Sequence, residues 1–109
     1  MLWNNYLTAW SSVTADERAR LLENSVDEQC IYGDPAQEAH GIAELSNYME
    51  QSQAKFPGCR FHNEQFLDHH EQGLCYWIMY DGQGATLTKG ASYSRRGANG
   101  KLIQMTGFF

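Results

Sequence analysis

The second half of the chain is a succession of strand-like segments joined by short turns. Four segments carry the β-branched and aromatic residues typical of strands, at residues 60–68, 74–80, 86–95 and 101–109. The three links between them each contain glycine, at residues 69–73, 81–84 and 97–100. Because links this short join neighbouring antiparallel strands, the pattern predicts a four-stranded meander.

The first half predicts three helices and one short strand. Residues 2–13 place apolar side chains at helical spacing, and residues 42–54 do the same. Thr14 followed by Glu17 is the signature of a capping box, which predicts a helix that begins directly after Thr14. Residues 26–32 are the strand candidate. Helices in the first half and strands in the second predict an α+β fold, with helices packed on a curved antiparallel sheet.

Composition excludes several classes of function. The length of 109 residues is that of a single domain, residues 1–109. The net charge of −5 and the scattered basic residues argue against nucleic-acid binding and against electrostatic membrane binding. Cys30, Cys59 and Cys75 have no CxxC spacing and are predicted to be buried thiols. With no secretion signal and no apolar membrane segment, we expect a cytoplasmic protein.

The segment Leu74–Tyr80 is apolar on both faces of its predicted strand. One face can cover the helices or a cavity, but the chain has no further segment to cover the other. Large exposed aromatic patches are rare on monomers. The sequence therefore predicts a homodimer packed through the sheet.

Taken in order, these elements resemble a known family. Its motifs are Tyr32-Gly33-Asp34-Pro35, Phe56-Pro57-Gly58, Gly90-Ala91-Ser92 and Gly100-Lys101-Leu102-Ile103. Over essentially the whole chain, they resemble the SnoaL-like branch of the nuclear-transport-factor-2-like (NTF2-like) superfamily. That superfamily includes ketosteroid isomerases, polyketide cyclases, limonene-epoxide hydrolases and scytalone dehydratase. The resemblance implies a cystatin-like cone, in which a bent sheet wraps the helices and leaves an apolar pocket.

Asp34, Tyr6 and Ser92 are the candidate catalytic residues. By resemblance, Asp34 matches the general base of ketosteroid isomerases, and a carboxylate partly desolvated among aromatic rings exchanges protons more readily near neutral pH. The alternative is that Asp34 only caps the turn before the next element. Tyr6 resembles the isomerases' oxyanion-binding tyrosine, or simply belongs to an apolar helix face. Ser92 stands where the isomerases have an aspartic acid donor, and a hydroxyl is a weaker acid.

The predicted pocket would suit a flat apolar or aromatic small molecule. Its expected ligand-binding residues are Trp10, Tyr32, His40, Phe61, His62, Trp77, Met105 and Phe109. Gly90 and Gly107 are expected to leave volume in the wall, and His40 and His62 to face the mouth. His69 and His70 are neighbours that would point to opposite faces of a strand, so no metal site is predicted.

Three functional hypotheses follow from these residues. The first is proton transfer next to a carbonyl, as in an isomerase, cyclase or dehydratase, with Asp34 moving the proton and no cofactor. The second is a non-catalytic module for ligand binding or dimerisation. The third is a hydrolase in which Asp34 and either His40 or His62 activate water.

Overall fold

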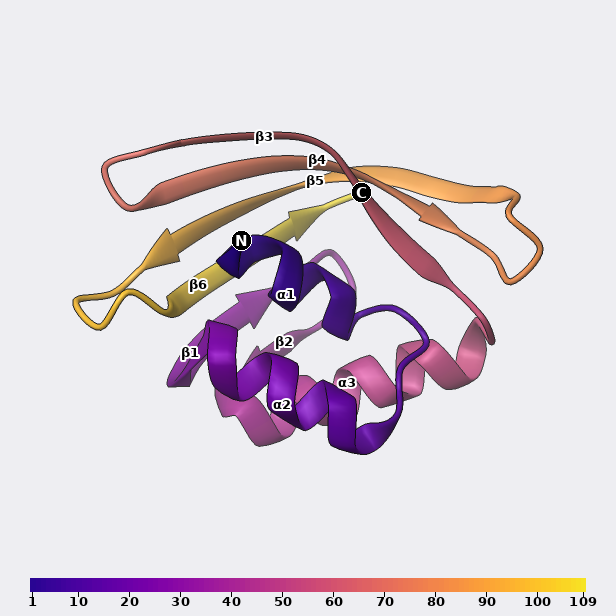
Figure 1. The fold of residues 1–109 in the computed structure, drawn as a ribbon, viewed down its shortest axis with the longest axis horizontal. Coiled ribbons are helices and arrows are strands. Elements are labelled where there is room, and N and C mark those ends of the chain that lie inside the picture. The colour runs from indigo at the N-terminus through magenta and orange to yellow at the C-terminus, as the bar shows by residue number, and fades with distance from the viewer.

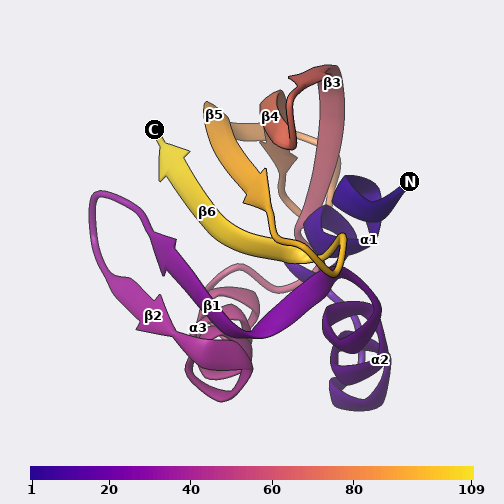
Figure 2. The same ribbon diagram turned by 90° about the vertical axis from the view of Figure 1, so that its left-hand side faces the viewer.

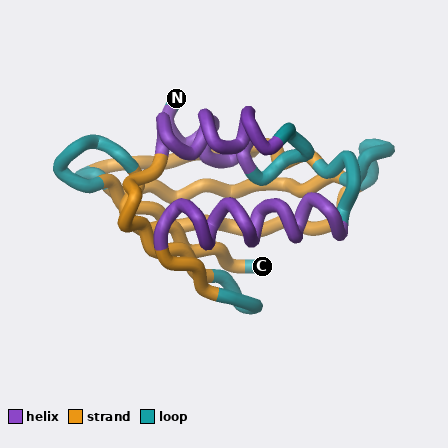
Figure 3. The backbone as a smooth tube through the Cα atoms, turned by 90° about the horizontal axis from the view of Figure 1, so that it is seen from below, coloured by secondary structure: helices purple, strands orange, loops and turns teal.

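The computed structural model describes all 109 residues as a layer of helices against one curved sheet (Figure 1). The helices are α1 (Leu2–Ala9), α2 (Ala15–Ser25) and α3 (Gly41–Lys55). The strands are β1 (Val26–Gly33), β2 (Glu38–His40), β3 (Arg60–His69), β4 (Gln72–Tyr80), β5 (Thr86–Arg96) and β6 (Leu102–Phe108). Seen from below, the helices lie over one face of the strands (Figure 3). The predicted α+β class is confirmed.

The six strands form one sheet in the order β2-β1-β6-β5-β4-β3. From β3 to β6 the pairs are antiparallel, which confirms the meander, whereas β1 lies parallel to β6. Register shifts interrupt four of the five strand pairings, and such bulges increase bend and twist. Viewed from the side, the strands follow an arc around the helices (Figure 2).

Two details of the first half differ from the sequence prediction. Helix α1 ends at Ala9, four residues before the predicted end, because the residues after it bond to other elements. The Ser12 backbone N–H donates to the Cys59 carbonyl at 2.9 Å, and the Phe61 N–H donates to Ser11 Oγ at 3.0 Å. The three-residue strand β2, which pairs with the end of β1, was not predicted. Thr14 does cap α2, since its Oγ1 accepts the Glu17 N–H at 3.1 Å.

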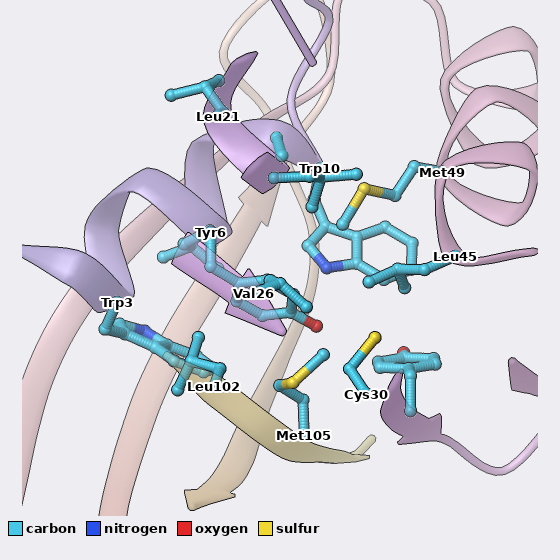
Figure 4. Packing of buried hydrophobic residues seen from close by; sticks show 14 of the residues in the cluster. Trp3, Tyr6, Trp10, Leu21, Val26, Cys30, Leu45, Met49, Leu102 and Met105 are labelled. Carbon is cyan, nitrogen blue, oxygen red and sulfur yellow. The ribbon is translucent and has the colours of Figure 1, made fainter. Parts of the chain in front are cut away.

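A hydrophobic core fills the space between the helices and one end of the sheet (Figure 4). In the close-up, Trp3 and Tyr6 of α1 and Leu45 and Met49 of α3 lie around Cys30 and Met105 of the strands. All three cysteines are buried free thiols, as predicted. No helix is both long and apolar enough to cross a membrane.

A polar network ties the three helices together beside this core. Arg18 of α2 is only 4% exposed, and its guanidinium donates to Ser46 Oγ at 3.2 Å and to Gln53 Oε1 at 2.6 Å, both on α3. The Gln53 amide in turn donates to the carbonyls of Ala9 and Ser11 at the end of α1. This network fixes the end of α1, where Trp10 begins the cavity wall described below.

Candidate functional site

Beyond the core, the sheet and helices enclose an apolar cavity of about 550 Å³. This volume lies within the usual range for small-molecule sites. Its aromatic and large aliphatic lining consists of Tyr6, Leu7, Trp10, Tyr32, Tyr48, Phe56, Phe61, Trp77, Met79, Leu87 and Phe109. The only charged side chains among the lining residues are those of Asp34 and Lys55.

Asp34 lies in the turn between β1 and β2 and serves two purposes there. Its Oδ1 accepts the backbone N–H groups of Ala36 at 2.8 Å and Gln37 at 3.0 Å, which caps the turn. Its Oδ2 accepts the hydroxyls of Tyr32 at 2.6 Å and Tyr48 at 2.7 Å. The turn-capping role, which was the alternative to a site role, is confirmed, and the same carboxylate also belongs to a residue of the cavity wall.

The two phenols remain neutral beside this carboxylate. Burial is the main cause that raises the pKa of Tyr32 and of Tyr48, and the Asp34 hydrogen bond adds to it. Asp34 has no ion-pair partner, since the three ion pairs of the structure involve other residues. Its carboxylate is therefore held by four neutral donors in a mainly apolar wall.

Tyr6 and Ser92 also face the cavity, and each retains a hydroxyl proton. Burial raises the pKa of Tyr6, and its hydroxyl, which lines the cavity, donates to no other group of the protein. Ser92 Oγ accepts the Trp77 indole N–H at 3.0 Å, so its own proton is free as well. Both residues can donate a hydrogen bond to an oxygen in the cavity.

Gly107 opens space between these groups, whereas Gly90 does not. Gly107 pairs with Ser92 on one side, and a Cβ built on it would lie 3.5 Å from Tyr32 Oη and 3.6 Å from Asp34 Cβ. At Gly90, a Cβ would lie 2.7 Å from Trp77 Cη2 and 2.8 Å from the Phe108 carbonyl oxygen. The expectation that Gly90 leaves volume is therefore wrong, because the Trp77 indole occupies that space.

Aromatic rings form a continuous wall from the polar end of the cavity outward. Trp10 lies 5.2 Å from Tyr32 and 5.5 Å from Tyr48, measured between ring centroids. Phe61 contacts Trp77 at 5.4 Å, and Trp77 contacts Phe109 at 5.9 Å. Rings at these distances pack edge-on or tilted, so they form a connected aromatic wall.

Three of the predicted site residues lie elsewhere. His40 is exposed on β2, where alternation turns Ala39 inward and its neighbours outward. His62 is exposed on β3, and the neighbouring Phe61 is the residue that lines the cavity. Met105 points inward, but it is buried in the core and only 1% exposed. It precedes the cavity-lining Gly107 by two residues on β6. The other predicted residues, namely Asp34, Tyr6, Ser92, Trp10, Tyr32, Phe61, Trp77 and Phe109, all line the cavity.

Several lining residues were missed in the sequence. Tyr48 was assigned only to the apolar face of its helix, yet a buried phenol needs a hydrogen-bond partner, and that need was the available signal. Lys55 and Leu87 lie at the end of α3 and the start of β5, and no sequence pattern distinguished them from surface residues.

The histidine pair at the β3–β4 turn also departs from expectation. His69 and His70 do not point apart: their Nδ1 atoms are 3.0 Å from each other. The reason is that His70 has a φ of 49°, outside the extended geometry in which neighbours alternate. No third metal-ligating side chain joins them.

Comparison with solved structures defines the class of fold. The chain has the fold shared by SnoaL-like and NTF2-like proteins, and other matches have ketosteroid isomerase-like and cystatin-like folds. A SnoaL-like family protein of Agrobacterium tumefaciens, whose name suggests an isomerase, matches with a TM-score of 0.91 at 23% identity, over 98% of this chain and 92% of that one.

Two further structures match less closely. One carries the name of a polyketide cyclase from Sinorhizobium meliloti, with a TM-score of 0.77 at 9% identity, over 97% of this chain and 92% of that one. The other is TerC crystallised with polyporic acid, with a TM-score of 0.76 at 13% identity, over 99% and 90% of the two chains. No family model and no curated protein matches the sequence.

Proposed function

We propose that this protein binds a flat, largely apolar small molecule and moves a proton next to its carbonyl group, as an isomerase or cyclase does. The supporting observation is the position of Asp34. Its carboxylate lies in the wall of an apolar cavity of about 550 Å³ and has no ion-pair partner. A carboxylate held in this way can accept and return a proton without a cofactor.

The remaining polar groups of the cavity suit the rest of such a reaction. Removing a proton next to a carbonyl places negative charge on the carbonyl oxygen, and preorganised donors stabilise that charge. Tyr6 and Ser92 both face the cavity with unused hydroxyl protons. The aromatic wall excludes water and holds the flat body of the ligand.

Two of the similar structures support this proposal through their names. The S. meliloti protein is named for a polyketide cyclase, and TerC was crystallised with polyporic acid. The hydrolase hypothesis loses its support, because neither His40 nor His62 lines the cavity.

A non-catalytic binding protein is the second candidate, and one observation favours it. All four hydrogen bonds to Asp34 come from the protein, so the carboxylate is already satisfied without a ligand. A binder would need Asp34 only to hold the turn and the two tyrosines in place.

Hydrogen exchange of an enolisable ketone separates the two candidates. We expect the protein to accelerate replacement of the benzylic hydrogens of 2-tetralone by deuterium in D₂O, followed by NMR. Asp34→Asn keeps an oxygen for the turn but removes the proton acceptor, so the rate should fall by about 100-fold or more. If the wild-type protein binds 2-tetralone and other flat ketones without accelerating exchange, the binding protein is the better description.

Asp81→Asn is the matched control. Asp81 also caps a turn, accepting the Gln83 and Ala85 N–H groups at 2.8 and 2.9 Å, but it lies outside the cavity. The Asp81 variant should exchange hydrogen at the wild-type rate. Equal rates in both variants and in wild type would remove Asp34 from the mechanism.

We also propose that the protein is a homodimer joined through the outer face of its sheet. Tyr76 on β4 and Phe108 on β6 flank Ala91 of β5 on that face and are 44% and 59% exposed. Leu67 of β3 pairs with Leu74 beside them and is 51% exposed. A second copy of the chain would cover this apolar surface with an identical one.

A further inference from the structure

All the hydrogen bonds around Asp34 are donated toward its carboxylate. Tyr32 and Tyr48 each have a single hydroxyl proton, and both protons are donated to Asp34 Oδ2. Oδ1 is occupied by two backbone N–H groups. A ligand at this end of the cavity therefore meets phenol oxygens that can only accept, while the carboxylate oxygens have no unused lone pair directed at it.

The open space at Gly107 lies against one of these phenols. The nearest atoms to a Cβ at Gly107 are Tyr32 Oη at 3.5 Å, Asp34 Cβ at 3.6 Å and Phe109 Cε2 at 3.6 Å. A substrate atom in this space would face the Tyr32 oxygen, whereas Asp34 presents its methylene group there. Tyr48 reaches the same carboxylate oxygen from α3 and is not among these neighbours.

We propose that Tyr32, and not Asp34, contacts the substrate and relays its proton to Asp34. The inference rests on the proposed function. The C–H bond next to the carbonyl breaks, its electron pair forms the C=C bond of the enolate, and the carbonyl π pair moves onto oxygen. The proton forms a bond to Tyr32 Oη as the original Tyr32 O–H bond breaks and its proton passes to Asp34 Oδ2. Tyr32 is neutral before and after, and one proton has moved from carbon to carboxylate.

The distance and the environment both suit this concerted transfer. The second proton crosses a hydrogen bond of only 2.6 Å. Tyr32 is 6% exposed, and burial disfavours a free tyrosinate, so the two transfers must occur together. The substrate then places its acidic C–H toward Tyr32 and its carbonyl oxygen toward the groups with free protons, Tyr6 and Ser92.

The 2-tetralone exchange reaction tests the relay through a pair of tyrosine variants. In Tyr32→Phe the relay is broken, and the rate should fall at least about tenfold, toward that of Asp34→Asn. In Tyr48→Phe the same carboxylate oxygen loses one donor but keeps its link to Tyr32. Oδ2 then has one lone pair more for the incoming proton, and the rate should rise.

Each other outcome is decisive. If Asp34 takes the proton directly, both tyrosine variants will exchange as fast as wild type or faster, and the relay is wrong while the proposed function stands. If Asp34→Asn is as fast as wild type, the proposed function itself fails.

A second measurement needs no variant and applies even if Tyr32→Phe does not fold. Loss of tritium from 2-tetralone tritiated at its benzylic carbon is compared in H₂O and in D₂O. In the relay, the proton between Tyr32 and Asp34 moves in the same step, so wild-type wash-out should be clearly slower in D₂O. Equal rates in the two solvents would contradict the relay.

Discussion

At the scale of single residues, Gly90 and Gly107 show how closely the cavity wall is fitted. We expect Gly90→Ala to destabilise the protein by about 1–3 kcal/mol, because the new methyl would overlap the Trp77 indole and the Phe108 carbonyl. Gly107→Ala meets only ordinary contacts at 3.5–3.6 Å and should unfold at nearly the wild-type temperature. It fills the space beside Tyr32, however, and should slow 2-tetralone exchange. Thermal unfolding and exchange rates of the two variants check both statements.

Some site residues could be predicted because their place at the end of a strand, or their match to the family's motifs, can be read from the sequence. Asp34 and Tyr32 follow from a strand that ends before Pro35, whereas Ser92 follows only from the resemblance. Among the residues that do not line the cavity, His40 and His62 needed knowledge of which strand face turns inward. The Asp34–Tyr48 bond joins residues 14 positions apart through the packing of α3 on β1, which no local pattern contains.

At the scale of elements, Gln53 links α1 to α3 and partners the buried Arg18. We expect Gln53→Ala to lower the free energy of unfolding by about 2 kcal/mol, since Arg18 and the Ala9 and Ser11 carbonyls lose their hydrogen bonds. Gln83→Ala is the control, because Gln83 lies exposed in a turn and its side chain makes no hydrogen bond. Urea unfolding of both variants gives the comparison. Equal stabilities would show that packing alone holds the end of α1.

Local signals were enough to identify most helices and strands. The capping residue Thr14 placed the start of α2, and the glycine-containing links placed the β3–β6 meander. Strand β2 escaped prediction because three residues carry no periodicity, and it forms only by pairing with β1. The parallel pairing of β1 with β6 joins the two halves of the chain and depends on the whole fold.

At the scale of the whole molecule, one curved sheet provides both a core and a cavity along the same strands. On β6, Met105 packs in the core while Gly107, two residues later, lines the cavity. On β1, Cys30 belongs only to the core, whereas Tyr32 belongs to the core and also lines the cavity. Beyond the core, aromatic residues of α1, α3 and the strands surround a space instead of filling it. The sequence predicted this cavity only through the resemblance, because residues that line a cavity and residues that fill a core share the same alternation.

The outer face of that sheet carries exposed apolar side chains that a second copy of the chain could cover. The molecule measures 39 × 27 × 25 Å, so one sheet face can bury the roughly 800 Å² per partner of a standard stable interface. We expect the wild-type protein to sediment as a dimer at micromolar concentration in analytical ultracentrifugation. Tyr76→Glu places a charge at the centre of the apolar surface and should shift the protein to monomer.

Leu87→Glu is the matched control, since Leu87 is 42% exposed but lies in the cavity wall. That variant should remain dimeric, because its charge does not enter the interface. A wild-type protein that sediments as a monomer would contradict the dimer and leave Tyr76 and Phe108 as an exposed apolar patch. A dimer that is lost equally in both variants would place the interface at the cavity mouth, where a second copy would contribute to the site itself.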